Sequence, residues 1–133
     1  MKPLFVDTGA WYALLNRLDS HHAEAADFLK STSRHLLTTN YVLVETVNLL
    51  NVRAGHGAAA LYLEQAHSSK ILTLHHIGAG QHGQAESYFR RHSDKGWSLT
   101  DCSSFVVMGE LGLTEAFSFD RHFSQAGFVR VPS

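Results

Sequence analysis

The sequence predicts an α/β fold in which a mainly parallel sheet carries helices on both faces. Short segments rich in β-branched and aromatic residues alternate with longer segments of helical composition. The 133 residues are enough for one domain with a hydrophobic core. The only two prolines, Pro3 and Pro132, lie near the ends of the sequence, so proline interrupts no internal element. Strands that alternate with helices usually pair in parallel through right-handed crossovers.

The first predicted strand, residues 3–6, is a short apolar run that stops at Asp7. A short helix is expected over residues 9–17. A second helix is expected over residues 21–32, because its apolar residues have helical spacing and Ser20 stands where an N-cap would stand.

The middle of the chain continues the alternation with a short strand at residues 35–39. Residues 40–55 contain valines and a tyrosine that would also allow a strand, but the length of the segment favours a helix. Asn40 is the expected N-cap of this helix and Gly55 its expected end. The alanine and leucine content of residues 57–69 predicts another helix.

The last part of the chain begins with a predicted strand at residues 70–77. A glycine-rich start then leads into a helix over residues 78–93. Thr100 is expected to cap a helix over residues 101–112, which ends at a glycine. Two further strands complete the predicted sheet, at residues 115–119 and 127–131.

The composition limits the possible functions. Eleven Lys and Arg stand against 12 Asp and Glu, so the net charge of −1 argues against a strongly basic nucleic-acid carrier but allows a local basic face. A single cysteine, Cys102, excludes an intrachain disulfide and is typical of a reducing compartment. The first 17 residues have too short an apolar run for a membrane span and no cleavage-site pattern. We therefore expect a cytoplasmic protein.

Two carboxylates stand at the carboxyl ends of predicted strands. Asp7 follows the first strand and Asp120 follows the fourth. Ligands of parallel sheets bind beyond these strand ends, so the two acids enter one crevice if their strands are neighbours. Asp101 opens the preceding helix, where the helix dipole favours a negative charge, and can face the same crevice. Glu45 lies on the helix after the second strand and is expected to point inward or along a groove.

Clustered carboxylates repel each other, and a divalent cation removes that cost. Mg²⁺ and Mn²⁺ prefer oxygen ligands, so either ion suits an all-carboxylate site. Such an ion activates water for hydrolysis of a phosphodiester. Any single Asp after a strand is more often a turn or cap residue. The order and context of the four acids together favour the metal site.

Four sequence blocks resemble those of PIN-domain nucleases, in particular the VapC-type toxin ribonucleases of toxin–antitoxin pairs. The blocks are FVDTGAWYALL, TTNYVLVETVNLL, WSLTDCSSFVVM and AFSFDRHFSQAGF. No single block is specific, but their order is, and the similarity extends from Pro3 to Pro132. The resemblance implies one PIN-like domain over residues 1–133, with three layers. It also implies a central parallel five-stranded sheet in the order 3-2-1-4-5.

The resemblance also implies the site. The family's four acids, which are catalytic and bind the metal, correspond here to Asp7, Glu45, Asp101 and Asp120. Thr8 matches the hydroxyl residue after the first acid, and Ser118 stands where the family usually has threonine. These two residues and Arg121 are expected to contact substrate or to support the acids. The implied cofactor is Mg²⁺ or Mn²⁺, and the implied partners are an RNA substrate, a cognate antitoxin and a second copy of the chain.

In the mechanism that we predict, Asp7 and Asp120 bind the main ion directly. Asp101 and Glu45 act through water or hold a second ion. Three arginines are candidate phosphate contacts, although each could equally be an ordinary surface residue with a packed stem: Arg17, Arg53 and Arg121. The ten histidines match no metal-binding motif and are expected at the surface, with His122 beside Asp120 as the exception to test.

Three other functions compete with that of an antitoxin-controlled toxin. A phosphoryl-transfer receiver domain also places acids at strand ends, but it needs two adjacent acids after its first strand and a lysine at a late strand end, which this chain lacks. A housekeeping RNA-processing nuclease of the same fold remains possible from sequence. A non-catalytic RNA-binding PIN-like protein is disfavoured, because it would gain nothing from four unneutralised acids.

Overall fold

The computed structural model describes all 133 residues, and its centre is one sheet of five parallel strands in the order β3-β2-β1-β4-β5. The predicted fold class and strand order are therefore confirmed. The strands are β1 (Leu4–Val6), β2 (Leu36–Thr39), β3 (Leu72–His75), β4 (Glu115–Phe117) and β5 (Val129–Val131). Each strand is shorter than its predicted segment: β1 and β2 lose one residue at the start, β5 loses two at the start, β4 loses two at the end, and β3 loses two at both ends.

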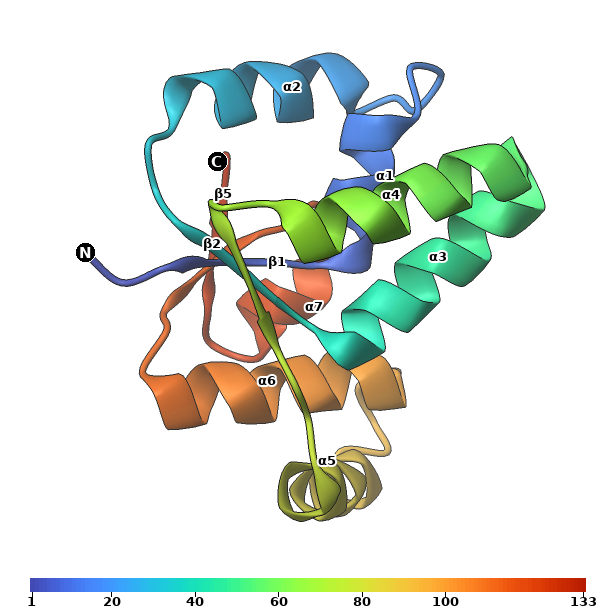
Figure 1. Cartoon of the computed structure of the whole chain (residues 1–133). Helices are drawn as coiled ribbons and strands as arrows, with labels where there is room; N and C mark the ends of the chain where they lie inside the picture. The colour runs from blue at the N-terminus through green and yellow to red at the C-terminus, as the bar shows by residue number, and fades with distance from the viewer.

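Seven helices surround the sheet. They are α1 (Thr8–Leu15), α2 (His22–Ser31), α3 (Asn40–Ala54), α4 (His56–Ser68), α5 (Ala79–Arg91), α6 (Leu99–Leu111) and α7 (Arg121–Gln125). In Figure 1, α2 and α4 lie on one side of the sheet, while α5 and α6 lie on the other. The sheet is thus covered on both faces, as a parallel sheet requires. None of the helices combines the length and apolar composition needed to cross a membrane.

The central position of β1 explains why its sequence is a continuous apolar run. Leu4, Phe5 and Val6 are all fully buried, because β1 lies between β2 and β4 and helices cover both faces. Phe123, from α7, packs near Phe5 with ring centroids 6.1 Å apart. The core therefore joins the strand before Asp7 to the helix after Asp120.

The predicted caps of three helices are wrong, because each helix begins one or two residues from the expected place. At α3 the Thr39 hydroxyl accepts from Val42 N at 3.1 Å, so Thr39 and not Asn40 is the N-cap. Asn40 instead accepts from Ile77 N at 2.7 Å and ties the chain after β3 to α3. Gly55 ends α3 as predicted, with a φ of 96°.

The other two caps differ in the same way. Ser98, not Thr100, caps α6, and its side chain accepts from Asp101 N at 3.0 Å. Asp101 returns the contact by accepting from Ser98 N at 3.1 Å, which makes a capping box. Ser20 does not cap α2, which begins after His21 without a side-chain cap.

Candidate functional site

The four predicted acids lie around one pocket at the carboxyl edge of the sheet. Asp7 follows β1 directly, and Asp120 lies just beyond β4, which pairs with β1 through Val6 and Phe117. Asp101 reaches the pocket from α6, and Glu45 reaches it from α3. The pocket has a volume of about 170 Å³, and its lining is Asp7, Thr8, Gly9, Val42, Glu45, Thr100, Asp101, Ser104, Asp120 and Phe123.

Asp7 is the buried acid of the pocket, with only 7% of the residue exposed. One carboxylate oxygen, Oδ1, accepts from Ala10 N at 2.9 Å, and the other, Oδ2, accepts from the Ser118 hydroxyl at 2.6 Å. The pKa of Asp7 is raised to about 7, chiefly by burial and to a smaller extent by the nearby charges of Asp120 and Asp101, while its two hydrogen bonds act to lower it. A cation in the pocket would favour the ionised form of Asp7.

Ser118 links the first and the fourth acid. Its hydroxyl donates to Asp7, and the backbone N–H of Asp120 donates to that same hydroxyl at 3.0 Å. Ser118 is 1% exposed, so its side chain supports Asp7 from the protein interior. This contact joins residues 111 positions apart in the chain.

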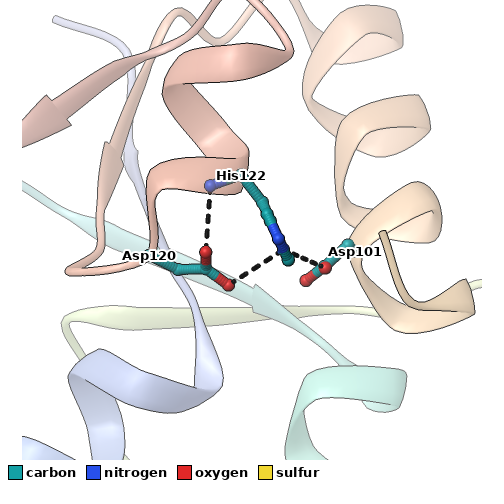
Figure 2. A group of neighbouring side chains, drawn as sticks. All are labelled: Asp101, Asp120 and His122. Carbon is teal, nitrogen blue, oxygen red and sulfur yellow. Dashed lines mark hydrogen bonds and ion pairs between the residues drawn. The ribbon is translucent and has the colours of Figure 1, made fainter. Parts of the chain in front are cut away.

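Asp101 and Asp120 face each other across the ring of His122. The Nδ1 atom of His122 lies 3.0 Å from Asp101 Oδ2 and 3.4 Å from Asp120 Oδ2. Figure 2 shows the ring between the two carboxylates, with Asp101 on α6 and the other two residues at the start of α7. One possible ligand atom from each residue lies within 4.8 Å of the other two. The three side chains are only partly exposed.

The remaining predicted site residues are placed less centrally. Glu45 is solvent-exposed at the rim of the pocket, on the α3 surface. Arg121 is exposed and is not part of the pocket lining. Arg17 is also exposed, and the Arg53 guanidinium lies 5.4 Å from the centre of the Tyr12 ring. The arginines therefore do not enter the acid pocket.

The pocket has the chemistry of a divalent-cation site. Carboxylate oxygens are the ligands that Mg²⁺ and Mn²⁺ prefer, and a cation would offset the repulsion between the acids. The Thr8 hydroxyl also lines the pocket, and its oxygen is buried without a hydrogen-bond partner in the protein. Because buried hydroxyls are normally hydrogen-bonded, this oxygen fits a site that takes a hydrated ion.

Sequence reasoning named the four acids but assigned no role to His122. The five-residue helix α7, which turns the histidine back toward the acids, was not predicted at all. The sequence signal that could have indicated this helix is Asp120, because aspartate is a preferred N-cap residue. Asp120 does cap α7, since its Oδ1 accepts from His122 N at 2.9 Å.

Comparisons with known proteins agree with this geometry. The model of the PIN domain family matches residues 4–129. The chain is 39% identical over 128 residues to the 23S rRNA-specific endonuclease VapC20 of Mycobacterium tuberculosis, covering 96% of this chain and 97% of that protein. It is 30% identical over 124 residues to a VapC ribonuclease of Archaeoglobus fulgidus, covering 90% of this chain and 78% of the relative.

Solved structures show the same similarity. The crystal structure of VapC20 from Mycobacterium tuberculosis, described as a sarcin-ricin loop cleaving toxin, superposes with a TM-score of 0.90 at 38% identity and covers 95% of this chain and 96% of that one. FitAcB from Neisseria gonorrhoeae superposes with a TM-score of 0.68 at 13% identity, over 96% of this chain and 95% of that one. The second match supports the fold alone.

Proposed function

The chain belongs to the PIN-domain family, among its VapC-type ribonucleases, and we propose that it cuts RNA with a divalent cation held by the acid pocket. The observation that carries the proposal is the convergence of Asp7, Glu45, Asp101 and Asp120 on one pocket. The ribonuclease activity follows from the family. The ion, Mg²⁺ or Mn²⁺, and the role of each acid are our proposals.

The residues present suit such an ion. Asp101 and Asp120 present carboxylate oxygens to the pocket, and each oxygen of Asp7 keeps a lone pair beyond its hydrogen bond to the protein. We propose that these three acids hold the ion and that Glu45, at the exposed rim, acts through water. A bound divalent cation would lower the pKa of a water and offset charge on the scissile phosphate.

The side chains around the ion would then position the reacting groups. Asp7 is fixed by Ser118 and Ala10 and must be ionised to take part, so its raised pKa makes ion binding release a proton near neutral pH. The free Thr8 hydroxyl can hold a water or a phosphate oxygen. Attack of water on phosphorus with departure of the 3′ oxygen leaves a 5′-phosphate product.

The proposed substrate class is ribosomal RNA, specifically the sarcin–ricin loop of 23S rRNA. The support is the 39% identity to an endonuclease named for 23S rRNA, over 96% of this chain, and the description of the solved structure of VapC20 as a sarcin-ricin loop cleaving toxin. The runner-up is a housekeeping RNA-processing nuclease of the same fold. A small antitoxin gene beside this one would favour the toxin.

We also propose that residues 1–133 form a single domain that works in the cytoplasm, pairs with an antitoxin and forms a homodimer. An apolar groove of about 360 Å³ supports a protein partner, and α1, α2 and α4 contribute to its walls. Trp11 and Leu15 both line the groove, and Leu15 is 41% exposed. The apolar residues of α1 therefore lie partly in the core and partly at the surface.

Removal of the ion tests the proposed function directly. Purified protein with Mn²⁺ should cut a sarcin–ricin loop RNA and leave a 5′-phosphate, because the bound ion would lower the pKa of the attacking water and offset charge on the scissile phosphate. Excess chelator should stop cleavage, and added Mn²⁺ should restore it. A panel of unrelated hairpins of equal length serves as the substrate control, with products mapped by gel and end-group analysis. Full activity in chelator would contradict the metal mechanism, and equal cleavage of every hairpin would contradict the proposed substrate.

A further inference from the structure

His122 is held with its ring edge directed at two of the acids. Asp120 caps α7 and accepts from the His122 backbone N–H at 2.9 Å, which fixes the residue at the start of the helix. Phe123, the next residue, is 1% exposed and anchors α7 in the core. The ring of His122 therefore extends from a fixed backbone position and points between Asp101 and Asp120 (Figure 2).

The distances around Nδ1 match those between neighbouring ligands of one ion. Adjacent ligands of an octahedral ion with bonds of about 2.1 Å lie about 3.0 Å apart. Nδ1 of His122 lies 3.0 Å from Asp101 Oδ2 and 3.4 Å from Asp120 Oδ2. An ion could therefore bind between these ligand atoms with little movement of the three side chains.

We propose that His122 binds the catalytic ion directly through Nδ1, beside Asp101 and Asp120, and that this nitrogen gives the site a preference for Mn²⁺ over Mg²⁺. The inference rests on the proposed function, since it concerns the same ion. Imidazole nitrogen is a common ligand of transition metals, whereas Mg²⁺ strongly prefers oxygen.

A different role for His122 makes a different prediction. If the histidine only bridges the two acids while the ion is absent, then the ring must leave when the ion binds. In that case no nitrogen would be bonded to the ion. Detection of a nitrogen atom bonded to the ion therefore distinguishes His122 as a ligand from His122 as a bridge that leaves when the ion binds.

The test is pulsed electron paramagnetic resonance of Mn²⁺ bound to the full chain without RNA. A directly bonded imidazole gives nitrogen modulation of the Mn²⁺ signal, and ¹⁵N-histidine labelling should change that modulation, which assigns it to the protein. The His122→Asn variant places an amide near the position of Nδ1 and should bind Mn²⁺ without the modulation. The matched control is His56→Asn, at an exposed histidine at the start of α4, which should keep it.

Affinities provide the second measurement. Calorimetric titration should show that His122→Asn lowers the preference for Mn²⁺ over Mg²⁺ by roughly tenfold or more, because loss of a ligand should cost at least as much as loss of a group that only supports one. If Mn²⁺ binds the wild type but its signal shows no nitrogen modulation, the inference is wrong and the proposed function still stands. Failure of the wild type to bind either ion would overturn both. Absence of the modulation in the labelled wild type would overturn the inference whatever the stability of the variant.

Discussion

Replacement of Asp120 by asparagine should reduce RNA cleavage by roughly a hundredfold to a thousandfold or more, the range seen when one charge-stabilising group is removed from an active site. The substitution removes one negative charge from the pocket and weakens the hold on the ion. It should not disturb the fold, because Asp120 also caps α7 and asparagine is an equally good N-cap. The measurement is kcat/KM on the sarcin–ricin loop RNA with saturating Mn²⁺.

The matched control for this prediction is Asp94→Asn. Asp94 lies in a polar turn before α6, its side chain is 72% exposed, and its ion-pair partner is the adjacent Lys95 at 3.6 Å. The control variant should cleave RNA at the wild-type rate. If Asp120→Asn stays within a few-fold of the wild type while its melting temperature and metal affinity are unchanged, the pocket is not the site of hydrolysis.

Replacement of Asp7 by asparagine should stabilise the metal-free protein at high pH. The pKa of Asp7 is about 7 in the folded state against 3.8 as the ordinary value, because burial disfavours the charged form. At pH values between these two pKa values, the folded chain holds a proton on Asp7 that the unfolded chain has lost. The free energy of unfolding therefore falls as pH rises through this range. At pH 8 the loss is complete and amounts to about 4 kcal/mol.

Asparagine avoids this loss because it carries no charge. Its amide oxygen can accept from Ala10 N, and its NH₂ group can donate to the Ser118 oxygen, so both contacts of Asp7 can be kept. Denaturant unfolding in chelator should show Asp7→Asn more stable than the wild type at pH 8, with the difference vanishing toward pH 4. Asp27→Asn, on an exposed position of α2, should follow the wild-type curve. A variant no more stable than the wild type at pH 8 would show that Asp7 is not held as an unfavourable buried charge.

Together these two expectations describe a site that costs stability to maintain. Asp7 is a buried acid whose charge becomes favourable only with a cation nearby, so the same substitution should stabilise the empty protein and impair the enzyme. Natural sites often show this conflict between stability and activity. The prediction distinguishes a functional acid from a structural one, since loss of a structural acid would lower stability at every pH at which it is ionised.

The sequence carried enough information for the fold and for the meeting of the acids. Asp7 and Asp120 each end a strand, and the resemblance implied that these two strands are neighbours, which the pairing of β1 with β4 confirms. Residues that follow neighbouring parallel strands must lie at the same edge of the sheet. For that reason the pocket could be anticipated without side-chain coordinates.

The details of the site could not be anticipated in the same way. The pKa of Asp7 is raised by burial, which arises only when the chain folds around it, and its hydrogen-bond partner Ser118 lies 111 residues away in the chain. His122 reaches Asp101 because the short helix α7 directs its ring at Asp101 and Asp120, and a five-residue helix gives no periodic pattern to detect. The wrong caps at α3 and α6 arose because an N-cap assignment fails when the boundary is off by a single residue or two.

The most direct measurement is the anomalous scattering of Mn²⁺ in crystals of the full chain grown with that ion. Coordination of one ion by the acids that follow β1 and β4 and by the acid on α6 predicts a strong anomalous peak inside the pocket, within bonding distance of Asp101 and Asp120. An empty pocket at saturating Mn²⁺, with the ion ordered only elsewhere on the surface, would contradict the proposal that these four acids form a single cation site.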